Sequence, residues 1–152
     1  MVQNKYMTTK QKVMVFIARP KGDGYEWLTR HNAPHPDHGG ARWYIVTGNV
    51  EPGESQDQAA TREAAEETGI SDVQKIVRLP LVSTYRSDKH PGVEYEEQAY
   101  LLLTDHSGQI VLNEESDDSQ WLSIDDFVAK IWWTEDRQTL KTLLSDALAN
   151  NQ

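Results

Sequence analysis

The chain has 152 residues, of which 38% are hydrophobic and 26% charged, and its formal net charge is −9. This length is typical of one domain with its own core, and we expect a single domain over 1–152 with a flexible tail at 1–10. The acidic balance disfavours nucleic acid and anionic membrane surfaces as partners. The sequence contains no cysteine, which excludes disulfides and thiolate-bound zinc. Since neither a signal peptide nor an apolar run of about 20 residues is present, we expect a cytoplasmic protein.

The first third of the chain predicts short strands around a loop. Val13–Ala18 is a continuous apolar run, which is typical of a buried strand. Turn residues 21–24 join it to the alternating segment Tyr25–Thr29, so the two segments predict a hairpin. His31–Arg42 is rich in proline, glycine and histidine and is predicted to be a loop, before a further strand at Trp43–Thr47.

The rest of the chain mixes helices and strands. A helix is predicted at Glu54–Thr68 and is ended by Gly69. Ser123 is expected to cap a short helix over 125–131, and Thr134 to cap a last helix with an apolar stripe of leucines. The mixture predicts an α/β layered domain. The further strands are predicted over Val73–Tyr85 with a break at Pro80, Tyr95–Thr104, Ile110–Leu112 and Trp121–Leu122.

Acidic residues crowd the segment from Gly48 to Ile70, GNVEPGESQDQAATREAAEETGI. On a helix, Glu63, Glu66 and Glu67 would share one face, where like charges cost about a few tenths of a kcal/mol per pair. Such a cluster is often only a solvated helix face. It is also what divalent cations would neutralise, because Mg²⁺ prefers carboxylate oxygens and keeps waters that substrate phosphates can replace.

The fixed residues of this segment resemble the Nudix box, G-x5-E-x7-R-E-U-x-E-E-x-G-U, in which U is aliphatic. All nine constrained positions match over 23 residues, with Ala64 and Ile70 at the U positions. A match of this length is specific, unlike a lone glycine motif. The resemblance implies an α/β/α sandwich around a mixed sheet. It also implies an enzyme that hydrolyses a diphosphate linked to another moiety, with Mg²⁺ or Mn²⁺.

The resemblance also implies roles for residues of the box. Glu63 and Glu67 are the expected direct metal ligands, joined by Glu66 and the carbonyl of Gly48. The remaining two, Arg62 and Glu54, are expected to pair and to hold the helix and its ligands in place.

The general base and a further metal ligand are sought outside the box. Glu115 and Glu114 lie where many similar enzymes carry a late acidic site, and Glu115 is narrowly favoured over Glu114. Glu96 and Glu97, on the preceding predicted strand, are the alternatives.

The expected partner is a small nucleotide or a related diphosphate. "TGNVEPGE", "QIVLNEE…QWL" and "WWTEDRQTL" resemble bacterial dihydroneopterin triphosphate pyrophosphatases, which also act on dATP. Arg30, Trp43 and Arg137 are the expected contacts to the ring or phosphate of the substrate.

Two alternative functions and one zinc hypothesis stay open. The chain could be a dinucleoside polyphosphate or nucleoside diphosphate-sugar hydrolase, or a Nudix domain that binds nucleotides without turnover. His31, His35 and His38 suggest a zinc site in the loop. Homodimers are frequent among similar proteins.

Overall fold

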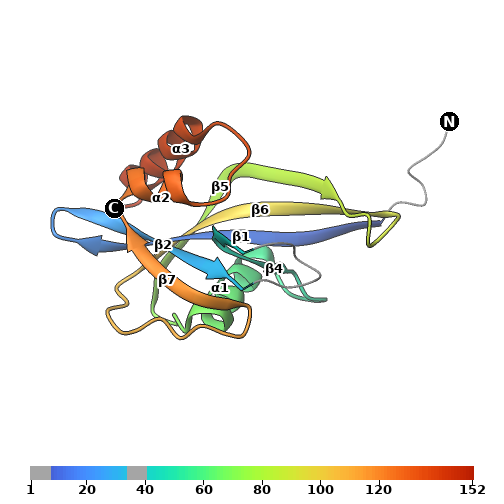
Figure 1. Ribbon diagram of the computed structural model, residues 1–152, viewed down its shortest axis with the longest axis horizontal. Helices are drawn as coiled ribbons and strands as arrows, with labels where there is room; N and C mark the ends of the chain where they lie inside the picture. Colours follow the sequence, from blue (N-terminus) through green and yellow to red (C-terminus); the bar gives the residue numbers. More distant parts are fainter. Residues whose placement is uncertain (1–7, 34–40) are drawn as a thin grey trace.

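The computed structural model of the protein describes residues 8–33 and 41–152. Figure 1 shows a mixed sheet with α1 on one face and α2 and α3 on the other, which confirms the expected α/β/α sandwich. In chain order the elements are β1 (Thr8–Lys21), β2 (Gly24–Asn32), β3 (Arg42–Tyr44), β4 (Val46–Asn49), α1 (Gln56–Thr68), β5 (Val73–Arg86), β6 (Val93–Thr104), β7 (Ser116–Leu122), α2 (Ile124–Lys130) and α3 (Arg137–Asn150).

The sheet divides around its central strand, β1. The main strand order is β3-β2-β1-β6-β5, with β7 paired to β2 and β4 paired to β1. β1 runs parallel to β6, and every other pair of described strands is antiparallel. β2 and β4 pair with different stretches of β1: β4 pairs with Lys12–Val15, and β2 pairs with Ala18–Lys21. Within the described residues β4 pairs with no strand other than β1.

Side chains of β1 alternate between two apolar layers, because successive residues of a strand face opposite sides of the sheet. One side of the strand packs against three alanines of α1, and the other packs against α2 and α3. The continuous apolar run Val13–Ala18 is explained by this double burial, as predicted. The α1 layer contains Val13, Val15, Ile17, Ala59, Ala60 and Ala64; the other layer contains Met14, Phe16, Ala18, Phe127, Leu140 and Leu144.

Helix boundaries differ from the prediction at two places. α1 begins at Gln56 with Ser55 as its N-cap in a capping box, so Glu54 precedes the helix and is not in its first turn. α3 is capped by Asp136, whose Oδ2 accepts from Thr139 N at 2.8 Å, and not by Thr134. In both cases the residue that caps the helix comes later in the chain than the residue at which the sequence predicted the helix to start: Ser55 follows Glu54, and Asp136 follows Thr134.

Strand boundaries differ more. Ile110–Leu112 is not a strand; it is a loop segment in which Val111 N donates to Thr68 O at 2.9 Å. The predicted strand Trp43–Thr47 is divided at Ile45 into β3 and β4, and Pro80 lies in a register shift within β5 and does not end it. Residues 8–10 of the expected tail belong to β1.

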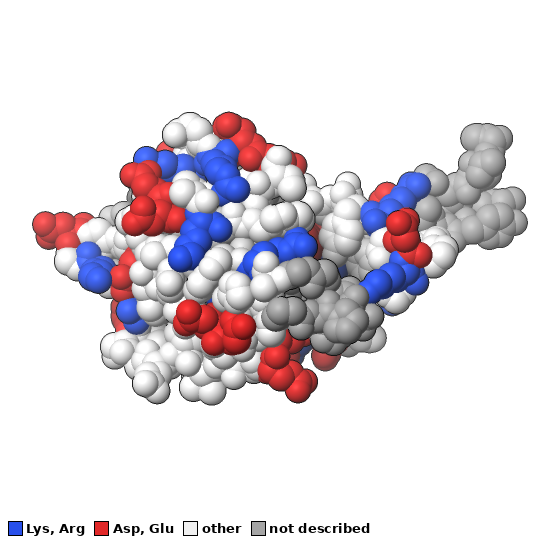
Figure 2. Space-filling view, viewed as in Figure 1, with Lys and Arg blue, Asp and Glu red and all other residues white. Residues whose placement is uncertain are grey.

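No helix in the described ranges is both long and apolar enough to cross a membrane. On the face drawn in Figure 2, basic side chains of the described residues are scattered among acidic ones and are not gathered into one field.

Candidate active site

Gly48 brings the backbone of β4 against α1. A Cβ added to Gly48 would lie 2.0 Å from Cδ of Glu63, far closer than atoms can approach. Only glycine therefore lets Glu63 lie against the β4 backbone, next to the Gly48 carbonyl that the box implies as a metal ligand. Gly53 in the following loop has φ of +81°, a conformation that favours glycine.

Replacing Gly48 with alanine is expected to reduce turnover by about 10–100-fold, the usual range for disturbing the support of a metal ligand. The backbone of Gly48 is not in the left-handed region, and the obstructing atoms are the end of a flexible side chain. The thermal stability should therefore change by no more than about 1 kcal/mol. Gly24→Ala, where no atom lies within 4 Å of the added Cβ, is the control. Unchanged turnover in Gly48→Ala would contradict this role for Glu63.

Arg62 is the centre of a hydrogen-bond network that fixes the start of α1. Its Nε donates to Oε2 of Glu54 at 2.7 Å and its Nη2 to Oε1 of Glu54 at 2.9 Å, which is the expected pair. Nη1 donates to Glu63 at 2.9 Å and to Glu66 at 3.2 Å, and Nη2 also donates to the Asn49 carbonyl at 2.8 Å. The hydrogen bonds from Arg62 lower the pKa of Glu54 to about 2, so this carboxylate stays ionised. The network joins β4, the loop and α1 into one rigid unit.

Glu67 lies one turn further along α1 and is buried, with 1% of its surface exposed. Its Oε1 is 2.5 Å from Nη2 of Arg30, a close ion contact that lacks hydrogen-bond geometry. Within the described residues neither carboxylate oxygen accepts a hydrogen bond. A buried carboxylate without donors is strongly disfavoured unless another positive group binds it.

Arg30 is buried and bonded to protein groups, and its expected contact with a substrate stays a prediction. It is 5% exposed, and its Nη1 donates to Ser116 Oγ at 2.5 Å and to Asn32 Oδ1 at 2.8 Å. Its Nη2 donates to the Ile45 carbonyl at 3.2 Å and also contacts Glu67. Arg30 therefore connects β2, β7 and the β3–β4 junction to α1, directly behind Glu67.

Burial raises the pKa of Glu67 to about 9, with Arg30 opposing the shift and the neighbouring carboxylates of Glu63 and Glu115 adding to it. The ordinary value is near 4.5. Three acidic side chains thus repel one another at one place, and a bound cation would remove that repulsion.

Because this pKa is raised on folding, Glu67 destabilises the metal-free fold increasingly as pH rises from about 4.5 towards about 9. We expect the thermal midpoint in EDTA to fall over this range and the fall to be smaller with Mg²⁺. Glu97 shifts in the same direction, so the comparison with Glu67→Gln isolates the contribution of Glu67. An equal slope in Glu67→Gln would contradict the assignment.

The donor set fits a hard cation. Carboxylate oxygens of Glu67 lack donors, and Gly48 leaves its carbonyl beside Glu63. Among the described residues no three acidic or histidine side chains already form a compact ligand group. Glu63 and Glu66 are instead bonded to Arg62, and the Glu66 side chain is 55% exposed. The ligand set from the box therefore stays a prediction.

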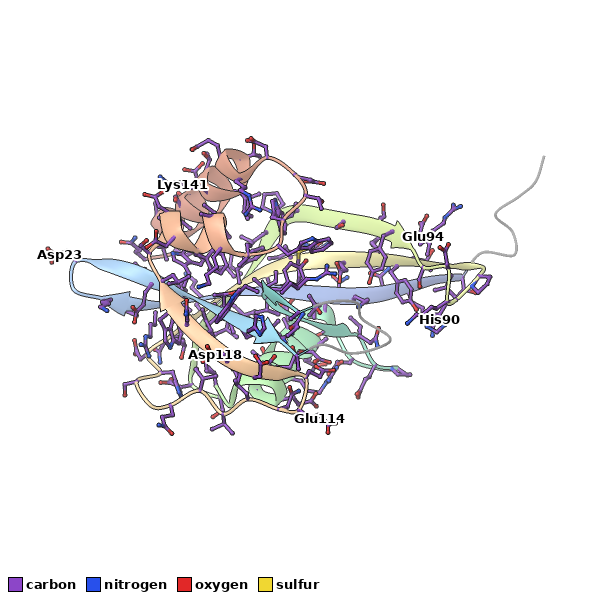
Figure 3. All side chains as sticks on the ribbon, viewed as in Figure 1. Asp23, His90, Glu94, Glu114, Asp118 and Lys141 are labelled. Atoms are coloured by element: carbon purple, nitrogen blue, oxygen red, sulfur yellow. The ribbon has the colours of Figure 1, made fainter. Side chains whose placement is uncertain are left out.

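Glu114 and Glu115 lie at the end of the loop between β6 and β7, and this loop contacts the end of α1. Val111 ties this loop to the end of α1, and Ala33 N donates to the Glu115 carbonyl at 3.1 Å. Both acids are exposed, and Figure 3 shows Glu114 on this loop beside α1. Of the two, Glu115 is the one whose charge raises the pKa of Glu67.

The alternative acids on β6 divide between the faces of the sheet. Alternation along β6 places Glu96 on the α1 face and Glu97 on the face covered by α2 and α3. Glu97 is therefore separated by the sheet from Glu67.

The other expected contacts have structural partners. Arg137 donates to the carbonyls of Val128 and of Ile131, the latter at 2.9 Å, so it holds the end of α2; its expected substrate contact stays a prediction. The ring of Trp43 packs against His31, with centroids 5.0 Å apart, and under the ammonium of Lys130. The zinc hypothesis rests on His35 and His38, which lie outside the described residues.

Two cavities of about 500 and 260 Å³ lie between β5 and α3, where Thr139 and Leu143 line both. None of the lining residues belongs to the box, so these cavities do not mark the candidate active site.

Comparison with known proteins agrees with this geometry. Residues 8–143 match the sequence model of the NUDIX domain family. The chain belongs to the NUDIX family. A protein from Myxococcus xanthus named octanoyltransferase is 32% identical over 133 residues, which are 84% of this chain and 35% of that protein. The dihydroneopterin triphosphate diphosphatase of Escherichia coli K12 is 37% identical over 82 residues, 47% of this chain and 55% of that protein.

A solved structure, the E. coli dihydroneopterin triphosphate pyrophosphohydrolase, superposes with a TM-score of 0.69 at 26% identity. The match covers 91% of this NUDIX chain and 99% of that chain. The chain spans between about a third and about a half of the length of the curated relatives named above.

Proposed function

We propose that this NUDIX protein is a Mg²⁺-dependent hydrolase that cleaves a nucleoside or pterin triphosphate into a monophosphate and pyrophosphate. The observation that carries the proposal is the buried carboxylate of Glu67. It has no hydrogen-bond donor among the described residues and is under the charge of Glu63 and Glu115. Arg30 lies 2.5 Å from this carboxylate and offsets its charge only in part, so a further cation would remove the remaining repulsion. A divalent cation on carboxylate oxygens would also supply the charge that phosphate chemistry uses.

Each residue has a part in this proposal. Glu63, Glu66, Glu67, Glu115 and the Gly48 carbonyl would hold the cation, which would polarise a phosphoryl oxygen and lower the pKa of a bound water. Arg62 orients the carboxylate of Glu63 through Nη1, and Glu54 fixes Arg62 by accepting two hydrogen bonds. Arg30 of β2 contacts the carboxylate of Glu67 and holds it in place. The exposed carboxylate of Glu115 accepts the proton of the attacking water.

The pterin or nucleoside triphosphate is favoured by the relative from E. coli K12, whose name gives dihydroneopterin triphosphate as its substrate. That match covers 47% of this chain and 55% of that protein, so it supports a substrate class and not one compound.

The test is a turnover panel with Mg²⁺ that contains (d)NTPs, dihydroneopterin triphosphate, diadenosine tetraphosphate and ADP-ribose, with products separated by ion exchange. The proposal expects pyrophosphate and a monophosphate from a triphosphate. Cleavage of only the dinucleotide or the sugar diphosphate would move the assignment to the alternative hydrolases. No turnover with Mg²⁺ or Mn²⁺ would favour a domain that only binds nucleotides.

A further inference from the structure

A second group of polar side chains lies on the other face of the sheet, away from α1. Glu97 of β6 is 7% exposed and has the ammonium of Lys12 at 3.8 Å, beyond hydrogen-bond distance. Lys12 Nζ donates instead to the hydroxyl of Tyr85 at 3.0 Å. Among the described residues no donor bonds to the carboxylate of Glu97. The Glu97 side chain is therefore largely buried, and its carboxylate accepts no hydrogen bond from the part of the chain that the structure describes.

Glu97 is a charged residue at a position where its neighbours on this face of β6 are apolar. The positions of β6 that follow on the same face, Ala99, Leu101 and Leu103, are apolar and pack under α2 and α3. A buried ionised group without hydrogen bonds costs free energy, and one ion pair at this distance offsets it only in part. Burial raises the pKa of Glu97, with Lys12 opposing the shift, in agreement with incomplete solvation.

Aromatic rings border Glu97 and Lys12. Tyr85 and Tyr95 stack with centroids 5.2 Å apart and an angle of 20°, and Lys12 Nζ lies 5.5 Å from the Tyr95 centroid. Tyr44 packs against the apolar layer on the same face of the sheet, and its ring contacts the half-exposed Trp132 edge to face. Flat side chains beside an open acceptor and an ammonium suit a planar polar ring. We name Lys12, Glu97, Tyr85, Tyr95 and Tyr44 the ring site.

The distance from the ring site to the Nudix box is about the length of one nucleoside. Lys12 pairs with Glu97 on one side and with Asn49 of β4 on the other. Because neighbouring strands lie about 4.8 Å apart, Glu97 is about 10 Å across the sheet from Asn49. The Asn49 carbonyl accepts from Arg62, and Gly48 precedes it. A ligand on this face would have to extend its phosphates past β4 to reach the acids of α1.

We propose that Glu97 and Lys12 recognise the ring of the substrate, and that this ring carries a 2-amino-4-oxopyrimidine edge, as guanine and pterins do. A carboxylate can accept from the ring N–H and from the neighbouring amino group at once, and an ammonium can donate to the adjoining carbonyl oxygen. Adenine offers one amino donor beside a ring acceptor, so it can bond to one carboxylate oxygen and to the ammonium but leaves the second carboxylate oxygen without a donor. The inference rests on the proposed function only for the direction in which the phosphates extend.

The test measures binding without turnover. Guanosine, adenosine and neopterin, which carry no phosphate, are titrated calorimetrically into the protein with Mg²⁺ present. The unaltered protein should bind guanosine and neopterin at least about tenfold more tightly than adenosine, the size of one hydrogen bond to a charged group. Glu97→Gln should abolish this preference, because an amide replaces one acceptor with a donor.

Glu26→Gln is the matched control. Glu26 is also 7% exposed and ion-paired, with Arg19 at 2.7 Å, but it lies by the β1–β2 turn. The control should keep the preference for guanosine. Equal affinity for guanosine and adenosine in the unaltered protein would overturn the inference, whether or not Glu97→Gln folds. So would an equal loss of preference in Glu26→Gln.

The same variants separate this inference from the proposed function. If the triphosphates are hydrolysed, Glu97→Gln should lower the ratio of kcat/KM for dGTP over dATP by about tenfold or more, mainly through KM, since the ring contact is remote from phosphorus. Hydrolysis with an unchanged ratio would overturn the ring site and leave the hydrolase standing. Guanosine binding that depends on Glu97, without hydrolysis of any triphosphate, would overturn the hydrolase and support the ring site.

Discussion

Glu67→Gln is expected to lower turnover of the best triphosphate by at least about 10²–10³-fold, the effect of removing one charge-stabilising group from a hydrolytic site. The substitution keeps the shape of the side chain and removes its charge. The fold should survive, because the amide oxygen still lies beside Nη2 of Arg30 and can accept from it. The measurement is kcat with saturating Mg²⁺, with circular dichroism to verify the fold.

The control is Glu51→Gln in the same loop–helix segment. The Glu51 side chain is 63% exposed and lies 3.7 Å from Arg62, at the rim of the network. Exposed ion pairs of this kind contribute little, so its turnover should stay within a few-fold of the unaltered protein. A Glu67→Gln protein that is folded and fully active would remove Glu67 from the chemistry.

At pH above about 9, where Glu67 is ionised in the folded protein, Arg30→Leu is expected to destabilise the fold by about 3–5 kcal/mol, because it leaves the charge of Glu67 buried and unpaired. For a chain of this length that lowers the thermal midpoint by about 10 °C. The loss should shrink as pH falls, since protonation removes the charge from Glu67, whose pKa is already raised and rises further without Arg30. The measurement is the thermal midpoint of both proteins across the pH range in EDTA.

The double variant Arg30→Leu/Glu67→Gln separates the ion contact from simple packing. If the loss comes from an unpaired charge, removing both charges should restore most of the stability. Additive losses would show instead that Arg30 stabilises the fold through Ser116, Asn32 and Ile45 and that its contact with Glu67 is incidental.

The box and α1 could be read from the sequence because their signals are local. The acids at spacings of three and four, the capping residue and Gly69 all lie within one segment. Polar β7 could not be read in the same way. Its Ser-Asp-Asp-Ser start lacks apolar alternation, and it becomes a strand through pairing with β2. Ile110–Leu112 is apolar because Val111 covers the end of α1 at Gly69, and not because it is a strand.

The residues that support the box, Arg30 and Ser116, could not be identified from the sequence. Nothing in "LTRHN" distinguishes a buried arginine from one that grips phosphate, because the difference arises when β2 and β7 bring Arg30 and Ser116 behind Glu67. No motif singles out Ser116. The partners of Arg137 could not be identified for the same reason, because they are backbone carbonyls at and after the end of α2. One feature of β6 could be read from the sequence: Glu96 and Glu97 are successive residues of a strand, so they face opposite sides of the sheet.

The most direct test of the account is a calorimetric titration of the unaltered protein and Glu67→Gln with Mg²⁺ and Mn²⁺. The account predicts saturable binding to the unaltered protein, weakened by about tenfold or more in the variant, as expected when a ligand of a carboxylate site is lost. Equal affinity in the two proteins, or no saturable binding to the unaltered protein with or without a bound nucleotide, would contradict a cation site at Glu67.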